Sequence, residues 1–334
     1  MTMNIKNEVE LILKKVNNSE YPFETFNIAN YTMKLYCNDL ELLEYFKNQM
    51  RLMITQNNKD NYFEISVLPS DDILKLTQYF SGSLYELILD DGTQVKMRKG
   101  TFVKNILYTW NAQSKKGMFL IDSSSLSNFK AIGHNLAPIY SLIARDINTI
   151  MVHGAVIGKD GKGFLISGLS GSGKSTLAAA GLYYGLEYVS DDTVLLDVDT
   201  YKAYPISSTI HLGPDAIKFF PGFTEKMLNY TQGRANKRHF DISAYSANFK
   251  SELEVIAVIQ PNIVSSDNPK LYTVRKEEIL MPIIYSSIFQ VGEKNTTNNL
   301  KKFLKVLRKL PTYKIDVTEN FEKSIDIIKN IRSD

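Results

Sequence analysis

Eight consecutive residues, from Gly168 to Ser175, fit the pattern G-x-x-x-x-G-K-[ST]. Three glycines in this stretch let the backbone turn tightly, and successive N–H groups can approach an anion because no Cβ stands in the way. Lys174 has the length and charge to reach the outer phosphates of a nucleoside triphosphate, and the Ser175 hydroxyl suits Mg²⁺. The pattern therefore predicts a nucleotide phosphate site. The alternative is a glycine- and serine-rich turn that binds nothing.

Asp191 and Asp192 follow a short strand, 17 residues after Lys174. One helix and that strand lie between, so the chain would return to the same end of the sheet. Carboxylates there could hold Mg²⁺, and one could accept a proton from an attacking hydroxyl. A solvated strand end is the alternative, since the aspartate pairs at 71–72 and 90–91 have the surroundings of turns.

His153 lies in the apolar run 151–157, shortly before the glycine-rich stretch. A histidine in a strand is usually satisfied by its neighbours, and spacing alone favours that interpretation. If this strand pairs with the strand that leads into the stretch, His153 instead lies near the level of the phosphate site. His211 and His239 carry no such argument.

The segment 232–239 holds three cationic residues, Arg234, Lys237 and Arg238, within five positions. On a loop near the phosphate site, such residues would clamp a phosphate or a peptide carboxylate. A solvated surface loop accounts for the same composition equally well. Both interpretations remain open.

The glycine-rich stretch needs a strand before it and a helix after it, and residues 163–167 and 174–184 have the composition for these. A further strand at 149–157 precedes them, and only six turn-forming or charged residues, 158–163, make the connection. Six residues are too few for a crossover helix, so the two strands are predicted to be antiparallel neighbours. This excludes the usual parallel β-α-β arrangement at this point.

Hydrophobic periodicity places further elements after this core. It predicts strands at 187–190, 193–198, 202–206, 253–259, 271–274 and 312–317 and helices at 277–289, 299–310 and 319–331. Pro261 is expected to end the strand at 253–259 because proline cannot donate to a ladder.

Residues 1–147 are predicted to form an α+β domain rich in antiparallel strands. Asn38 or Asp39 offers an N-cap for a helix through Met50, and the sequence Asp-Asp-Gly at 90–92 between alternating runs is a strong hairpin signal. No cluster in this half suggests chemistry. Substrate docking, dimerisation and support of the second half remain open as its role.

The composition of the 334-residue chain is that of an ordinary globular protein, with 44% apolar and 22% charged residues. Lys and Arg outnumber Asp and Glu by only 39 to 36, which gives no reason to expect nucleic acid or an anionic membrane as partner. No run of 18 apolar residues is present. Cys37 is the only cysteine, so no internal disulfide forms, and a cytoplasmic location is expected.

The runs His153-Gly154-Ala155, Ile166 to Leu177 and Val189-Ser190-Asp191-Asp192 resemble the catalytic domain of HPr kinase/phosphorylase and its relatives. That family shares its core with phosphoenolpyruvate carboxykinase, in which an antiparallel strand leads into the phosphate loop. The resemblance implies a phosphoenolpyruvate-carboxykinase-like P-loop core with a mixed sheet at 148–334. The fold class expected for the whole chain is α/β and α+β.

The resemblance further implies a kinase that uses ATP and Mg²⁺ to phosphorylate a serine hydroxyl. It assigns the triphosphate to Gly168, Ser170, Gly171, Ser172, Gly173, Lys174, Ser175 and Thr176. Ser175 and Asp192 match the metal-linked positions, Asp191 matches the acid/base aspartate, and His153 matches a histidine beside it, with Lys174 also catalytic. One sequence does not resolve which aspartate is the base and which binds metal.

Two departures from the family pattern bear on the activity. Bifunctional members carry Glu after the loop serine, where this chain has Thr176, and the glycine-rich segment that accompanies phosphorolysis is not found here. The layout instead resembles HPr-kinase-like serine kinases of biosynthetic pathways, including kinases of lasso peptide precursors. That resemblance implies a serine-containing peptide or protein as substrate. A homo-oligomer is possible.

Two other functions remain open from the sequence. One is a nucleotide-responsive binding module that recognises a partner without phosphorylating it. The other is a kinase for a small hydroxylated metabolite such as free serine.

Overall fold

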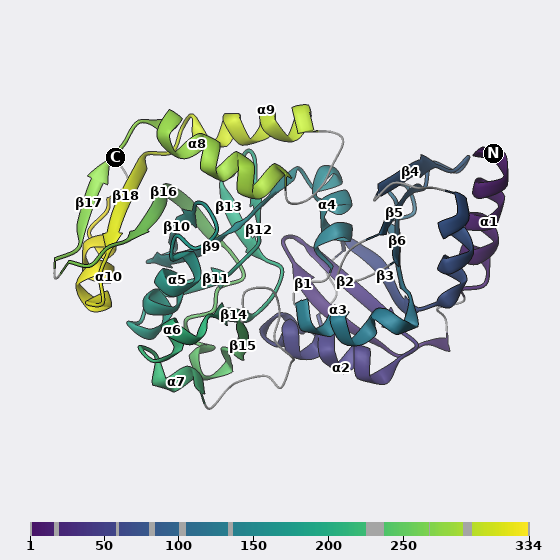
Figure 1. Cartoon of the computed structure of the whole chain (residues 1–334), viewed down its shortest axis with the longest axis horizontal. Coiled ribbons are helices and arrows are strands. Elements are labelled where there is room, and N and C mark those ends of the chain that lie inside the picture. The colour runs from purple at the N-terminus through teal and green to yellow at the C-terminus, as the bar shows by residue number, and fades with distance from the viewer. Residues whose placement is uncertain are drawn as a thin grey trace. The chain divides into compact units, whose positions relative to one another are not determined.

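The computed structural model describes residues 2–16, 20–57, 60–79, 84–99, 105–132, 136–224, 237–266, 268–289 and 296–332. Within these, residues 2–143 belong to one compact unit and residues 144–332 to a second (Figure 1). Both units combine helices with mixed sheets, which confirms the predicted α/β character. The P-loop core, the boundary after residue 147 and the roles of the two halves stay predictions.

A seven-stranded sheet organises the described part of the first unit, in the order β1-β2-β3-β7-β6-β5-β4. Its strands are β1 (Phe23–Ile28), β2 (Tyr31–Cys37), β3 (Tyr62–Pro69), β4 (Leu84–Ile88), β5 (Gln94–Lys99), β6 (Asn105–Asn111) and β7 (Lys116–Ile121). The hairpin predicted around 90–92 is confirmed by β4 and β5. However, β3 pairs in parallel with both β2 and β7, so the sheet is mixed, not purely antiparallel.

The described helices that begin in the first unit are α1 (Thr2–Lys14), α2 (Leu40–Gln49), α3 (Leu126–Ile132) and α4 (Ala137–Asp146), with 3₁₀ turns at Arg51–Met53, Asp71–Tyr79 and Ser123–Ser125. The last turn of α4 belongs to the second unit. Asp39 caps α2 as expected, because its side chain accepts the N–H of Leu42. Cys37 is fully buried in β2, and this burial raises the pKa of its thiol to about 12. The cysteine is therefore a core residue and no nucleophile.

In the second unit, a mixed sheet has the order β11-β9-β10-β16-β13-β12-β8, with β18 on β16 and β17 on β18. The strands are β8 (Thr149–Val152), β9 (Gly154–Lys159), β10 (Lys162–Ser167), β11 (Glu187–Ser190), β12 (Val194–Asp197), β13 (Lys202–Pro205), β16 (Leu253–Ile263), β17 (Lys270–Thr273) and β18 (Thr312–Val317). A separate pair, β14 (Thr209–Leu212) and β15 (Arg238–Asp241), was not predicted.

Helices cover both faces of this sheet. The helices described in the second unit are α5 (Lys174–Tyr183), α6 (Pro214–Ile217), α7 (Pro221–Thr224), α8 (Lys276–Ile284), α9 (Thr296–Leu307) and α10 (Phe321–Lys329), with a 3₁₀ turn at Ser243–Tyr245 and a π-helical turn at Tyr285–Phe289. Val156 of β9 and Leu165 of β10 belong to the core that includes residues of α8 and α9. Ile157, which follows Val156 in β9, packs against Gly181 of α5 instead. Alternate strand residues thus serve two layers. Figure 1 shows α5 and the pair α8 and α9 on different sides of this sheet.

The predicted hairpin before the glycine-rich stretch is confirmed, since β9 and β10 are antiparallel with Ile166 opposite Ala155. The strand predicted at 149–157 is wrong as a single element. It breaks at His153, after which β9 pairs with β10 and β11, while β8 pairs with β12. The break places His153 at a junction between strands.

Pro261 does not end β16, which continues to Ile263. Val258 and Val264 donate their N–H groups toward the β18 side, to Pro311 O and Val317 O. By alternation the nitrogen of Pro261 faces the other side, where β10 has already ended opposite Ile259. The missing N–H therefore costs no ladder hydrogen bond.

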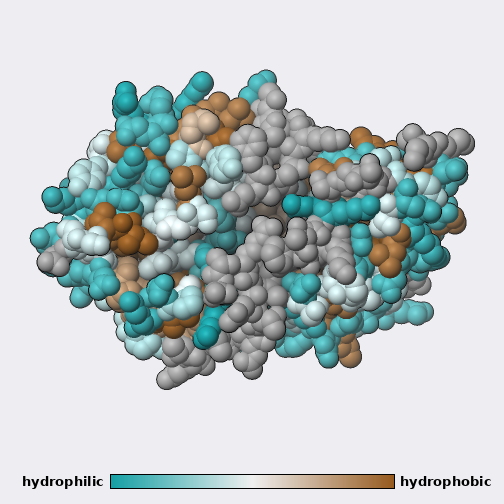
Figure 2. Space-filling view, viewed as in Figure 1, coloured by the Kyte–Doolittle hydropathy of each residue, from teal (hydrophilic) through white to brown (hydrophobic). Residues whose placement is uncertain are grey.

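On the face drawn in Figure 2, the apolar residues among those that the structure describes are scattered between polar ones. Large exposed apolar side chains such as Leu40, Ile88 and Met281 lie on different elements. Isolated exposures of this kind are normal and mark no docking surface. Within the described ranges, none of the helices combines the length and apolar character that crossing a bilayer requires.

Gly181 provides a test of how α5 is seated on the sheet. A Cβ at this position would lie 2.7 Å from Cδ1 and 3.3 Å from Cβ of the buried Ile157. Gly181→Ala gains about 1 kcal/mol of helix propensity, but overpacking a filled interior costs about 1–3 kcal/mol. We expect a net loss of about 1 kcal/mol in urea unfolding. A stabilised variant would contradict this seating.

Candidate functional site

The glycine-rich loop, residues 168–173, connects β10 to α5. Gly171 and Gly173 have φ of +82° and +97°, a region that is strained for residues with a Cβ. Gly173 is also the N-cap of α5, and its carbonyl accepts the N–H of Leu177. The loop thus leads directly into the positive end of a ten-residue helix. Ser170 is exposed on this loop, whereas Ser172 and Thr176 are partly buried.

Lys174 lies over the loop that precedes it. Its Nζ donates hydrogen bonds of 3.0 Å to the carbonyl oxygens of Gly168 and Leu169, and only 8% of the residue is exposed. Burial lowers the pKa of Lys174, and the nearby Lys237 lowers it further. Among the residues that the structure describes, none forms an ion pair with this ammonium group. A buried cation of this kind favours an anionic ligand.

Ser175 is the first residue of α5 beyond Lys174, and it is also buried. Its Oγ accepts a hydrogen bond of 3.2 Å from Nζ of Lys237, which directly precedes β15. Lys237 belongs to the cationic segment singled out in the sequence, and the structure brings its side chain to the loop. Arg234 and the rest of 232–236 lie outside the described residues.

Asp191 is buried at the end of β11, with 1% of its surface exposed. Its Oδ2 accepts the backbone N–H of His211 at 3.1 Å, and Nδ1 of His211 lies 3.9 Å from the same oxygen. Its Oδ1 is buried and has no hydrogen-bond partner in the described ranges. Leaving a buried polar atom unpaired costs about 1–3 kcal/mol, and more for a charged group. Such an atom in a native fold calls for an explanation, for which a bound water, an ion or a catalytic role are the usual ones.

His211 was given no role from the sequence, and the structure changes that assessment. It lies on β14 opposite His239 of β15, and the two buried rings pack with centroids 4.2 Å apart. Its contact with Asp191 depends on the β14–β15 pair, whose strands are separated by 25 residues of chain. The alternating residues 209–212 were the available sequence signal for this strand.

Asp192 has φ of +68° and turns away from the buried surroundings of Asp191. Its side chain is 34% exposed, and Oδ1 lies 3.6 Å from Nδ1 of His153. Its backbone carbonyl accepts the N–H of Gly154. Aspartate is among the residues that tolerate left-handed backbone best, so the turn can carry two carboxylates with different exposure.

His153 is fixed through its backbone. Its N–H donates to Ser287 Oγ at 3.0 Å, and its carbonyl accepts from Ser167 Oγ at 2.9 Å. Burial lowers the pKa of the imidazole, and this effect exceeds the opposing influence of Asp192. The ring is therefore predominantly neutral at pH 7, where it can donate one hydrogen bond and accept one.

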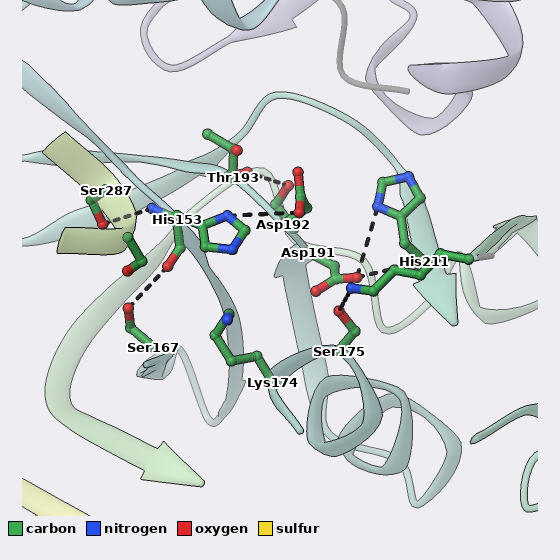
Figure 3. A network of polar contacts seen from close by, with 12 residues as sticks. His153, Ser167, Lys174, Ser175, Asp191, Asp192, Thr193, His211 and Ser287 are labelled. Carbon is green, nitrogen blue, oxygen red and sulfur yellow. Dashed lines mark hydrogen bonds and ion pairs between the residues drawn. The ribbon is translucent and has the colours of Figure 1, made fainter. Parts of the chain in front are cut away.

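Figure 3 shows these side chains gathered at the end of β10, with Lys174 and Ser175 below and His153, Asp192, Asp191 and His211 above. Two ammonium groups, a helix N-terminus and two carboxylates lie around one place. The donors suit phosphate. A hydroxyl and an exposed carboxylate suit a hard cation such as Mg²⁺, which usually keeps waters and phosphate oxygens as its other ligands. In the described ranges, no cluster of three or more His, Cys, Asp or Glu forms a complete metal cage.

Comparison with known protein families finds no match for this chain, and comparison with curated proteins finds none either. Among solved structures it is similar to the Hpr(Ser) kinase/phosphatase from Coxiella burnetii, with 16% sequence identity over 54% of this chain and 92% of that chain. The TM-score is 0.27. A likeness of this size carries no argument about fold or function, so the geometry of the site must carry the functional conclusion.

Two adjacent buried serines test how His153 is held. Ser287→Ala removes the acceptor of the His153 N–H, and we expect it to lower the unfolding free energy by about 1–3 kcal/mol. Ser286 is equally buried, but its Oγ only donates to the carbonyl of Ile283. Ser286→Ala should therefore cost about 1 kcal/mol or less. Equal losses for the two variants in urea unfolding would contradict this role of Ser287.

Proposed function

We propose that this protein is an ATP- and Mg²⁺-dependent kinase that phosphorylates a serine hydroxyl of a peptide or protein. The observation that carries the proposal is the buried carboxylate of Asp191, whose Oδ1 has no hydrogen-bond partner in the described ranges, beside a loop that holds two ammonium groups. A hydroxyl that donates to this oxygen would remove the cost of leaving it unpaired. The acceptor and the phosphoryl donor would then meet in one place.

The charge around the loop supports a triphosphate as the donor. Lys174 and Lys237 lie close enough for Lys237 to lower the pKa of Lys174, so two like charges are kept together. A polyanion offsets this repulsion, and the backbone N–H groups of residues 169–175 add donors to it. The N-terminus of α5 adds about 0.3–1 kcal/mol of attraction.

In the proposed reaction, Oδ1 of Asp191 takes the proton of the serine hydroxyl as its oxygen bonds to the γ-phosphorus. The bond between that phosphorus and the bridging oxygen breaks, and ADP leaves with the electron pair. Lys174 stabilises the charge on the transferred group. Ser175 and Asp192 would hold Mg²⁺, which would supply further positive charge to the phosphates when bound. The neutral His153 orients Asp192.

Serine as the acceptor rests on the resemblance to HPr-kinase-like enzymes. Because Asp191 is buried, the acceptor group that reaches it must be as small as a hydroxyl. A serine in a peptide and free serine both meet this requirement. Side-by-side assays of ATP consumption with serine peptides and free serine decide between the two.

Asp191→Asn tests the proposed base. The amide keeps the shape of the side chain but does not accept the proton, so we expect the rate of phosphorylation to fall by about 10²–10⁴-fold. ATP affinity should change by no more than about threefold, because the substituted oxygen faces the acceptor. The measurement is mass spectrometry of cell extract or serine peptides incubated with labelled ATP. Asp90→Asn, an exposed aspartate of the first unit, serves as the matched control.

Retention of full turnover by Asp191→Asn would contradict its role as base. A wild-type protein whose affinity for a partner responds to ATP, with no phosphorylated product, would indicate a nucleotide-responsive binding module instead. Product formed on free serine, but on no peptide, would indicate a metabolite kinase.

A further inference from the structure

The contact between Lys237 and Ser175 goes beyond the roles assigned so far, and its interpretation rests on the proposed function. Nζ of Lys237 donates to Ser175 Oγ at 3.2 Å. That same hydroxyl is the proposed ligand of Mg²⁺. An ammonium group therefore lies where the metal is expected to bind.

The two cations compete for this hydroxyl on electrostatic grounds. A serine oxygen has two lone pairs, so its valence alone does not prevent both contacts. However, if Mg²⁺ and the Lys237 ammonium group both bound the Ser175 oxygen, a divalent ion and an ammonium group would lie within a few ångströms of each other, next to Lys174. The repulsion between such charges is strong where water is excluded. Simultaneous occupation is therefore disfavoured.

Lys237 is anchored so that its side chain can leave this position while its backbone stays. The next residue, Arg238, begins β15 and pairs with Leu212 of β14. The residue is partly exposed, and no ion pair in the described ranges holds its ammonium group. Its four-carbon stem can swing away from the hydroxyl without moving the strand.

We propose that Lys237 and Mg²⁺ occupy Ser175 in turn. Without metal, Lys237 is the cation that neutralises the phosphates next to Ser175. When Mg²⁺ binds, Lys237 moves off the hydroxyl, and the metal takes over the neutralisation of these phosphates. Lys237 is thus a positioning residue that sets how strongly nucleotide binding depends on the metal.

Lys237→Met tests this by direct binding measurements. Isothermal titration of ATP in the presence of a chelator should show affinity about tenfold weaker than wild type, whereas affinity for MgATP should stay within about twofold. Because the thermodynamic cycle must close, Mg²⁺ should bind the ATP complex of the variant up to about tenfold more tightly than it binds the ATP complex of the wild-type protein. Lys237→Arg, which keeps the charge, should restore metal-free binding to within about threefold of wild type.

Lys250→Met serves as the control, since this lysine of the same unit is paired with Glu187 on the surface. Equal weakening of ATP and MgATP by Lys237→Met would make Lys237 an ordinary phosphate contact and overturn the proposal. Unchanged binding of both would overturn it as well. Failure of the proposed kinase shows separately, as wild-type protein that binds MgATP but forms no phosphorylated product.

Discussion

The arrangement of the site depends on the close approach of two backbones at Gly154. A Cβ there would lie 2.5 Å from the carbonyl oxygen of Ile166, so only glycine allows β9 to start beside the end of β10. From this junction, the N–H of Gly154 reaches the carbonyl of Asp192. His153 just before it bonds to Ser167 and Ser287. One backbone–backbone hydrogen bond and two bonds between the His153 backbone and serine hydroxyls thus bring four separate segments together.

Burial then distinguishes two neighbouring carboxylates. Asp191 faces the interior and is held by β14, while Asp192 faces outward next to His153. Tyr188 supports this division, because its hydroxyl donates to the carbonyl of Thr209 and ties β11 to β14. Burial raises the pKa of Tyr188 well above its usual value, and the two aspartates add to this effect, so the phenol stays a neutral donor.

The elements that could be predicted from the sequence are those that depend on residues close together in the chain. The glycine-rich loop, the helix that begins at Lys174 and the β9–β10 hairpin each follow from a short run of residues. The contacts of Ser287 with His153 and of His211 with Asp191 cross 134 and 20 residues, and they depend on how distant strands pair. No spacing rule for a single sequence contains that information.

Other errors have equally specific causes. The strand predicted at 149–157 breaks because its two halves pair with different partners, which alternation of apolar residues does not reveal. Pro261 fails to end β16 because its nitrogen faces the side on which the neighbouring strand has stopped. The register of neighbouring strands decides both outcomes.

The account depends on a triphosphate bound at the glycine-rich loop with its last phosphorus facing Asp191. A crystal structure with a non-hydrolysable ATP analogue and Mg²⁺ tests this most directly. We predict phosphate oxygens on the N–H groups of residues 169–175, with the metal next to Ser175 and Oδ1 of Asp191 turned to the γ-phosphate. A loop that stays empty at saturating nucleotide, or a nucleotide bound elsewhere, would contradict the account.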